Sequence, residues 1–221
     1  LNLWMHEPAE VAARYATLTE THGERFLLGI GVSHAPLIDS QEPGRYRKPL
    51  AATKAFLDGI DASPTPVPTG NRVLAALGPK MLELSATRAA GAHPYLSTPD
   101  HTRSARELLG DAPMLLPEQS VLLVDNRDDA RAIGTDWLRS YLGLPNYANN
   151  ILRSGFTEED ISTVSDRLFD ALIAWGDEET VLRRVNEHLD AGADHVCVQV
   201  LTADAREFPR EQWRRLAAAL S

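Results

Sequence analysis

The sequence predicts an α/β protein built on a parallel β-sheet. Five apolar segments are typical of buried strands, and predicted helices separate them along the chain. These strands are expected at Arg25–Gly31, Arg72–Leu77, Ala92–Leu96, Ser120–Val124 and Ala193–Leu201. Such alternation indicates parallel pairing, because parallel strands need a long crossover connection. The pattern alone leaves open a closed eight-stranded barrel and an open doubly wound sheet.

One strand–helix–strand unit, residues 72–98, shows the pattern most clearly. The apolar run Arg72–Leu77 ends at Gly78-Pro79, and proline suits the first turn of a helix because its missing N–H would have no partner there. Gly91 ends the predicted helix, and the next strand follows. The backbone N–H groups at this helix start could hold an anion, although any strand-to-helix turn has this property.

The segments before this unit alternate in the same way. Leu1–Trp4 resembles the end of an apolar strand, and Pro8–Thr21 is rich in helix-forming residues. The strand at residues 25–31 is followed by Val32–Gly44, which we expect to be a long polar loop. A helix is expected over Lys48–Asp61, and the proline-rich Ser63–Gly70 is too short for a domain linker.

After the unit, helices predominate. The expected helices are Asp100–Leu109, Asp128–Leu142, Glu158–Trp175, Glu178–Ala191 and Pro209–Leu220; the last carries Trp213, Leu216 and Leu220 at helical spacing. Pro145–Gly155 is expected to be irregular or a short helical turn.

Composition excludes several classes of function. At 221 residues the chain is long enough for one domain with a sizeable core, and the formal net charge of -9 disfavours binding to nucleic acid or an anionic membrane. No run of about 18 apolar residues predicts a membrane span. The single cysteine, Cys197, suits a reducing compartment, so we expect a cytoplasmic protein. Residue 1 is Leu and the first residues lack the charged and apolar regions of a signal peptide, so we expect that an upstream part is missing.

Six motifs, in order along nearly the whole chain, resemble one family. They are GERFLLGIGVSHAP (23–36), YRKPL (46–50), LAALGPKMLELSATRAAGAHPYLSTPDHT (74–102), LPEQSVLL (116–123), YLGLPNYANNILRSGF (141–156) and HLDAGADHVCVQVL (188–201). Together they resemble the bacterial luciferase-like monooxygenase superfamily, in particular its actinobacterial branch that uses the deazaflavin coenzyme F420.

The resemblance implies a (β/α)8 TIM barrel of the luciferase-like type that forms a single domain over residues 1–221. It aligns Leu1–Trp4 with the end of the third strand and the five predicted strands with the fourth to the eighth. The first two strands and their helices would then lie upstream of Leu1. A helical insertion is expected at about residues 143–176.

The resemblance also implies where a cofactor binds, because barrel enzymes carry their sites at the carboxyl ends of the strands. Three turns would line the site: Asn2 and Leu3 under the flavin ring, Gly31, Val32, Ser33 and His34 beside it, and Ala76, Leu77, Gly78 and Pro79 around the cofactor phosphate. Each turn also has a purely structural interpretation. Asn2 and Leu3 would be part of a frayed terminus, the glycines of the second turn would allow tight packing with His34 in solvent, and Ala76–Pro79 would be a plain strand-to-helix connection.

The other polar residues give weaker signals. We expect a structural role for His93, while His101 is equally consistent with ligand contact and with a plain position in a helical turn. His195 and Cys197 lie on one strand face, but two ligands do not make a zinc site, so no metal is expected. Asn146, Tyr147, Asn149 and Asn150 form an amide-rich patch in the insertion, facing substrate or making helix-end hydrogen bonds.

The function implied is an F420-dependent oxidoreductase, with FMN as the alternative cofactor, a small-molecule substrate and a homodimeric state. The acid–base residue of related enzymes is expected upstream of Leu1, so no catalytic residue is assigned. The alternative is a non-catalytic, truncated barrel fragment that does not bind cofactor by itself. An unrelated phosphate-binding aldolase is disfavoured, because no lysine lies at a predicted strand end to form a Schiff base.

Overall fold

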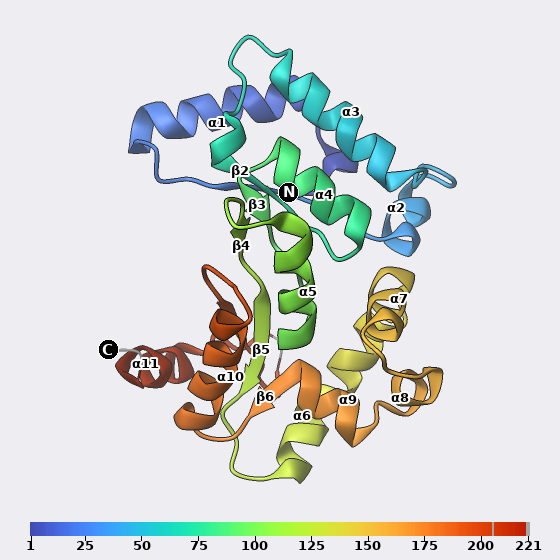
Figure 1. The fold of residues 1–221 in the computed structure, drawn as a ribbon, viewed down its shortest axis with the longest axis vertical. Coiled ribbons are helices and arrows are strands. Elements are labelled where there is room, and N and C mark those ends of the chain that lie inside the picture. Colours follow the sequence, from blue (N-terminus) through green and yellow to red (C-terminus); the bar gives the residue numbers. More distant parts are fainter. Residues whose placement is uncertain (205, 220–221) are drawn as a thin grey trace. The chain divides into compact units, whose positions relative to one another are not determined.

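The computed structural model describes residues 1–204 and 206–219, and it confirms the α/β class. The chain divides into two compact units, each with its own parallel strands (Figure 1). The first unit comprises Leu1–His93 and Leu108–Met114, and the second comprises Pro94–Glu107 and the chain from Leu115 onward. The single domain, the closed barrel and the two missing strands stay predictions.

The first unit contains a parallel sheet in the order β1-β2-β3-β4. Its strands are β1 (Leu28–Ile30), β2 (Arg72–Leu74), β3 (Gly91–Ala92) and β4 (Met114–Leu115, whose second residue belongs to the second unit). Its helices are α1 (Pro8–His22), α2 (Ala35–Gln41), α3 (Pro49–Asp61) and α4 (Pro79–Arg88), with short 3-10 turns η1 (Leu3–Met5) and η2 (Thr69–Asn71). A parallel bridge between Asn2 and Gly31 extends the pairing beside β1.

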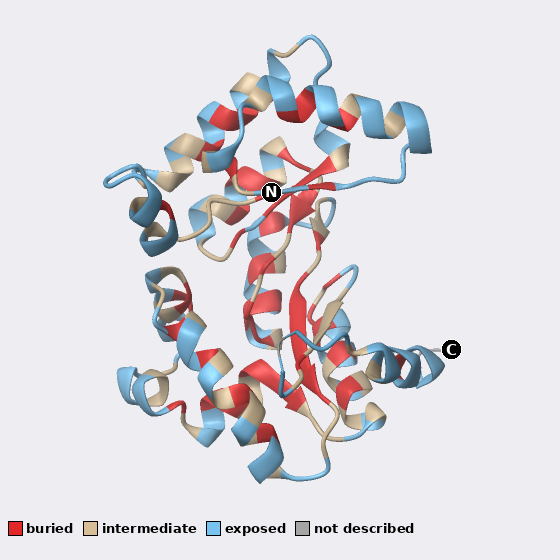
Figure 2. Cartoon of the chain, turned by 180° about the vertical axis from the view of Figure 1, so that it is seen from behind, coloured by how far each residue is buried: buried red, intermediate tan, exposed pale blue. Residues whose placement is uncertain are grey.

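The core of the first unit follows from strand alternation. Leu28 and Ile30 of β1 are buried, whereas Gly29 between them is exposed. These two side chains pack in one cluster with Leu74 of β2 and with the apolar faces of α1 and α3, which contribute Ala12 and Leu57. In Figure 2 the buried positions of this unit follow its strands and the inner sides of its helices.

The second unit contains a three-stranded parallel sheet in the order β6-β5-β7. Its strands are β5 (Glu118–Leu122), β6 (Ile173–Trp175) and β7 (Cys197–Val200). Its helices are α5 (Pro99–Leu109), α6 (Arg127–Leu142), α7 (Pro145–Arg153), α8 (Glu158–Thr163), α9 (Asp166–Leu172), α10 (Glu178–Asp190) and α11 (Arg210–Ala219). One face of the sheet packs Val121 and Ala174 against Val181 of α10 and Leu216 of α11. The predicted helical position Leu220 lies outside the described residues.

Several predictions of secondary structure were wrong. Leu3–Met5, at the expected strand end Leu1–Trp4, form the 3-10 turn η1, and only Ala92 of the expected strand Ala92–Leu96 lies in a strand. The expected loop at residues 32–44 contains α2, which starts after His34 with Pro36 in its first turn. The segment at 145–155 contains the nine-residue helix α7, which also begins with a proline. The expected helix Glu158–Trp175 is divided into α8, α9 and the strand β6, which was not among the five expected strands.

The division of the segment 158–175 has two causes. Val164 ends α8 in the left-handed conformation, with φ at 50°, and Ser165 starts α9 by accepting the Leu168 N–H through its hydroxyl. After α9, residues 173–175 pair in parallel with Ser120–Leu122 of β5. An extended Ile-Ala-Trp segment gains ladder hydrogen bonds and burial there, so tertiary pairing overrides a weak helical preference.

Candidate functional site

The predicted cofactor segments leave the sheet of the first unit at one edge. β1 and β2 run parallel with Ile30 opposite Leu74, so the residues that follow both strands emerge at the same carboxyl edge. The Ala75 N–H donates to the Ile30 carbonyl across this edge, at 2.9 Å. The structure therefore brings together the segments that contain Gly31–His34 and Ala76–Pro79.

The amino-terminal segment is attached to the same edge through backbone hydrogen bonds. The Leu3 N–H donates to the Gly31 carbonyl at 3.0 Å, and the Gly31 N–H donates to the Leu1 carbonyl at 2.9 Å. Asn2 uses its side-chain oxygen to accept the Trp4 N–H. Leu3 points into the core and is 6% exposed, so its backbone is what it can present to a ligand.

The segment after β1 makes a sharp turn before α2. Ser33 has a φ of 54°, in the left-handed region that non-glycine residues adopt rarely. Its carbonyl and that of Val32 are engaged by aromatic side chains: Tyr46 Oη lies 3.5 Å from Ser33 O, and Trp4 Nε1 donates to Val32 O at 2.7 Å. His34 precedes the first residue of α2, and partial burial lowers the pKa of its imidazole. The turn is thus held by contacts from distant segments.

Gly29 and Gly31, at the end of β1, differ in whether packing explains the absence of a side chain. A Cβ built at Gly31 would lie 3.2 Å from the Ala75 Cβ, so tight packing explains this glycine. A Cβ at Gly29 would meet nothing within 4 Å, and packing does not explain it.

The turn after β2 leads directly into α4. Ala76 is 3% exposed, and Gly78 caps the helix with φ −89° and ψ 157°, values that any residue can adopt. Pro79 is the first helical residue, no side chain caps the helix start, and its first turn has no acidic residue. The positive end of the helix dipole is therefore not neutralised by the chain's own carboxylates, which suits an anionic ligand.

A small cavity adjoins the Trp4 side of this site. It measures about 350 Å³ and lies within the size range of small-molecule pockets. Its lining includes Trp4, His6, Glu10, Ile38, Gln41 and Arg45. Trp4 stacks on Tyr46 with ring centroids 5.5 Å apart, and Arg45 donates to the Trp4 carbonyl. The predictions omitted these residues, although the motif at 46–50 pointed to this loop.

In the second unit a buried carboxyl also escaped prediction. Glu118 of β5 is 4% exposed, and its oxygens accept the Leu96 N–H at 3.1 Å and the Ser120 hydroxyl at 2.5 Å. Burial raises the pKa of this carboxyl to about 7, although both hydrogen bonds oppose the shift. Glu118 begins a short polar run, Glu118–Ser120, inside the otherwise apolar segment 114–124, which was the available signal.

A buried histidine forms a second polar network in this unit. His188 of α10 is fully buried, with Nδ1 2.8 Å from the Thr102 hydroxyl and Nε2 3.0 Å from Gln119 Oε1. Gln119 donates through Nε2 to the carbonyls of Ser120 and Leu172, so its Oε1 is the acceptor for His188. Nε2 therefore carries a proton. Burial lowers the pKa of the imidazole to about 4, so the ring is neutral at neutral pH and Nδ1 accepts from the Thr102 hydroxyl.

His93 and His101, which the sequence also singled out, take part in hydrogen bonds through their backbone N–H groups. The His93 N–H donates to the Leu74 carbonyl, and the His101 N–H donates to the Thr98 hydroxyl at the start of α5. Among residues 1–204 and 206–219, no group of three or more His, Cys, Asp or Glu side chains is placed to hold a metal ion. No helix within these same ranges has the length and apolar character needed to cross a membrane.

Comparisons with known proteins are informative for the fold. No protein-family model and no curated protein matches the sequence. Solved structures do match. A coenzyme F420-dependent tetrahydromethanopterin reductase from Methanopyrus kandleri is 18% identical with a TM-score of 0.70, over 90% of this chain and 75% of that one.

Two oxygenases match to a similar degree. EDTA monooxygenase from Chelativorans sp. BNC1 is 12% identical with a TM-score of 0.70, over 100% of this chain and 71% of that one. The oxygenating component of a type II Baeyer–Villiger monooxygenase from Pseudomonas putida, solved in complex with FMN, is 15% identical with a TM-score of 0.65 and covers 97% of this chain and 74% of that one. These neighbours are luciferase-like monooxygenases, and the chain shares their fold.

Proposed function

We propose that this chain is a flavin- or deazaflavin-dependent oxidoreductase that binds coenzyme F420, or alternatively FMN, at the carboxyl edge of the sheet in the first unit. One observation carries the proposal: three separate segments meet at this edge, and the family resemblance implies that all three line a cofactor. The F420- and FMN-linked neighbours support the same class of cofactor.

The residues present fit the two ends of such a cofactor. Backbone angles at Gly78 do not require glycine, and a glycine at this position would let a ligand approach the start of α4 closely. The uncapped start of α4, with no acidic residue in its first turn, suits the phosphate group. The turn at Gly31–Ser33, held by Trp4 and Tyr46, would present its backbone to the ring system.

The chain's own residues would bind and orient the cofactor. Gly78 and the start of α4 hold the phosphate, while Asn2, Leu3 and Gly31–His34 position the ring. When bound, such a cofactor supplies hydride transfer with a small organic molecule. We assign no acid–base residue.

The test is a fluorescence titration of the full chain with F420 and with FMN. The Gly78→Asp variant places a negative charge beside the proposed phosphate, so we expect its affinity for both cofactors to fall at least about tenfold, or about 1.4 kcal/mol. Aspartate is a favourable residue before a helix, so α4 should remain intact. Riboflavin, which lacks the phosphate, should bind the native chain and the variant equally.

Gly70→Asp is the matched control. Gly70 precedes β2 at the opposite end of the strand, it is exposed, and a Cβ there meets nothing within 4 Å. Equal loss of affinity in both variants, or none in Gly78→Asp, would contradict the phosphate site. Failure of the native chain to bind either cofactor would contradict the proposed function and favour a chain that does not bind cofactor by itself.

A further inference from the structure

One face of the sheet in the second unit is polar, which is unusual for a parallel sheet. β5 and β7 pair with Glu118 opposite Cys197 and Ser120 opposite Gln199, so these four side chains share a face. The alternate face carries Val121, Val198 and Val200, which belong to the core, together with Gln119, which binds His188. Parallel sheets are normally apolar on both faces, so Glu118, Ser120 and Gln199 in register beside Cys197 indicate a use other than packing.

Aromatic side chains from three other segments gather beside this face. Tyr95 precedes α5, Tyr141 lies near the end of α6 and Tyr147 lies in α7. Their ring centroids are 5.4 to 6.1 Å apart. Trp137 extends the cluster, 4.9 Å from Tyr141. We call these four rings the aromatic cluster.

A hydrogen bond joins the aromatic cluster to the polar face. The Tyr95 hydroxyl donates to Gln199 Oε1 at 2.8 Å and lies 3.4 Å from the Tyr141 hydroxyl. Burial is the largest cause that raises the pKa of Tyr147 and of Cys197. The charge of Glu118 adds to both shifts, for Tyr147 after the effect of Tyr141. The four aromatic residues and the four polar ones therefore form one local environment.

The turn that carries Tyr95 is strained, and Glu118 holds it. Leu96 has a φ of 53°, a left-handed conformation that is costly for a leucine, and its N–H is bound by the Glu118 carboxylate. Such strain is kept where surrounding contacts determine the geometry, and it is frequent at ligand sites.

An unsatisfied buried donor lies on the same helix as Tyr147. Asn150 is 2% exposed, and within the described part of the chain no group accepts a hydrogen bond from its Nδ2. It follows Tyr147 by three residues in α7, so both lie on one side of that helix. A buried donor without a partner is rare, and it indicates a missing acceptor such as water or a ligand.

We propose that the polar face of β5 and β7, together with the aromatic cluster, is a binding site for a small, uncharged organic molecule that has a ring and a hydroxyl or carbonyl group. The claim that the bound molecule is the substrate rests on the proposed function. The claim that this face binds such a molecule does not depend on that function. Tyr95, Tyr141 and Gln199 are partly exposed, so an incoming ligand meets aromatic rings and neutral hydrogen-bonding groups.

The preference for an uncharged ligand follows from the same residues. No member of the site is cationic, and the carboxyl of Glu118 would repel an anion. A cation is disfavoured because Glu118 is buried with hydrogen-bond donors on both oxygens, so it cannot form an ion pair without losing them.

The experiment uses three probes with one ring and different charge: benzyl alcohol, benzoate and benzylamine. Each is titrated into the full chain by ligand-detected NMR without cofactor, so failure of cofactor binding does not affect the result. Benzyl alcohol should bind at least about fivefold more tightly than the other two. Tighter binding of benzoate or benzylamine, or no binding of benzyl alcohol, would overturn the proposal.

Variants locate the binding. Tyr95→Leu and Gln199→Leu should each weaken benzyl alcohol about fivefold to tenfold, whereas Tyr95→Phe, which keeps the ring, should lose about twofold to threefold. Trp213→Leu is the control, because Trp213 is an exposed aromatic residue on α11 outside the site. Circular dichroism verifies that each variant is folded. If Tyr95→Leu and Gln199→Leu are both folded and both bind benzyl alcohol with the affinity of the native chain, the proposal is also overturned.

Discussion

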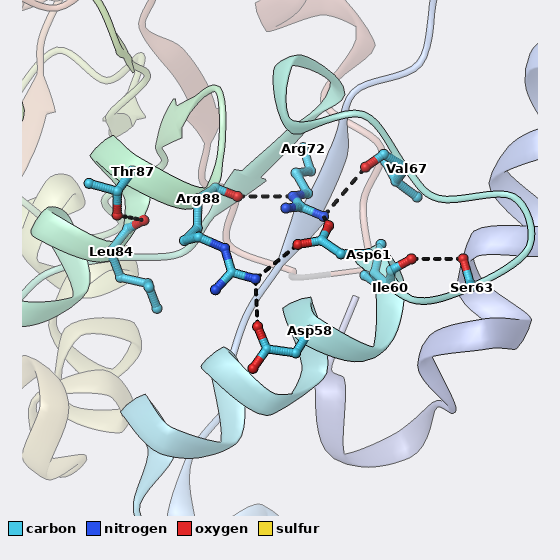
Figure 3. A network of polar contacts seen from close by, with 9 residues as sticks. All are labelled: Asp58, Ile60, Asp61, Ser63, Val67, Arg72, Leu84, Thr87 and Arg88. Carbon is cyan, nitrogen blue, oxygen red and sulfur yellow. Dashed lines mark hydrogen bonds and ion pairs between the residues drawn. The ribbon is translucent and has the colours of Figure 1, made fainter.

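The two units of this chain bury their polar side chains in opposite ways. The first unit buries a charge: Arg72, at the start of β2, is 1% exposed. Its guanidinium donates to Asp61 at 2.6 Å and to the Arg88 carbonyl at 2.9 Å (Figure 3). Arg88 also pairs with Asp61 and with Asp58, both on α3. The Arg72 hydrogen bond is the largest of several effects that lower the pKa of Asp61.

The second unit buries two groups, His188 and Glu118, whose charged forms are disfavoured by burial. His188 is held neutral between Thr102 and Gln119, and Glu118 is a carboxyl whose charged form is disfavoured by burial. The comparison teaches that stability in the first unit depends on keeping an ion pair, whereas stability in the second depends on pH. The predictions below test this difference.

The largest expected effect is in the first unit. Arg72→Met keeps much of the buried volume but leaves the backbone carbonyls of Val67 and Arg88 without this donor, and Asp61 keeps Arg88 as its partner. Each buried carbonyl without a donor costs about 1–3 kcal/mol, so we expect the free energy of unfolding to fall by about 3–5 kcal/mol, measured by urea denaturation. Arg14→Met, at an exposed position of α1, should change it by less than about 0.5 kcal/mol. A loss below about 1 kcal/mol for Arg72→Met would show that the buried charge is not structurally important.

Glu118→Gln is expected to stabilise the second unit at alkaline pH. The pKa of Glu118 is about 7 in the folded chain against an ordinary value of 4.5, so the native state binds a proton that the unfolded chain has lost. The contribution of Glu118 to the free energy of unfolding therefore falls by about 3 kcal/mol as the pH rises from 4.5 to 7. Above pH 7 the glutamine variant should be more stable by up to this amount, and at pH 4.5 the difference should nearly vanish.

The matched control for this variant is Glu107→Gln, an exposed carboxyl on α5. Urea denaturation at several pH values should show little difference between the control and the native chain. A pH-independent difference between Glu118→Gln and the native chain would show that Glu118 is charged throughout.

His188 should act in the opposite direction. Its pKa is about 4 in the folded chain against 6.5, so its contribution is complete above pH 6.5 and is lost as pH falls toward 4. When the pH falls from 7.5 to 5, the free energy of unfolding of the native chain should decrease by about 2 kcal/mol more than that of His188→Gln. His22→Gln, at the exposed end of α1, is the control. Nitrogen NMR at pH 5.5 showing a charged His188 ring would contradict the neutral network.

The smallest expected effect concerns backbone conformation. Lys48, which precedes α3, is exposed and has a φ of 48°. Lys48→Gly removes the steric cost of this conformation and should stabilise the chain by up to about 1 kcal/mol. Val164→Gly, at a similar φ in the second unit, should instead destabilise it, because Val164 is fully buried. Equal effects of the two variants would show that backbone strain outweighs burial at both positions.

Helix starts were largely predictable from the sequence. Pro8, Pro49 and Pro79 begin helices of the first unit, and no side chain caps these three. In the second unit several helices are capped by side chains instead, as Asn126 caps α6 and Asp177 caps α10, whereas α7 again begins with a proline and has no such cap. Prolines and short polar residues encode such boundaries locally, so predicted and observed helices agree within a few residues outside the segments 32–44, 145–155 and 158–175.

The local sequence determined the alternation of strands and helices, and with it the parallel sheets and the meeting of the 31–34 and 76–79 turns at one edge. Only the tertiary structure decided the rest. β6 is a strand because β5 lies beside it, and His188 is neutral because Thr102 and Gln119, which are 86 and 69 residues away along the chain, surround it. The polar face at Glu118 exists because β7 pairs with β5 in that register. Helix propensity and the proline or polar residues that mark helix starts act over a few residues. Burial and strand pairing depend on which distant segments meet.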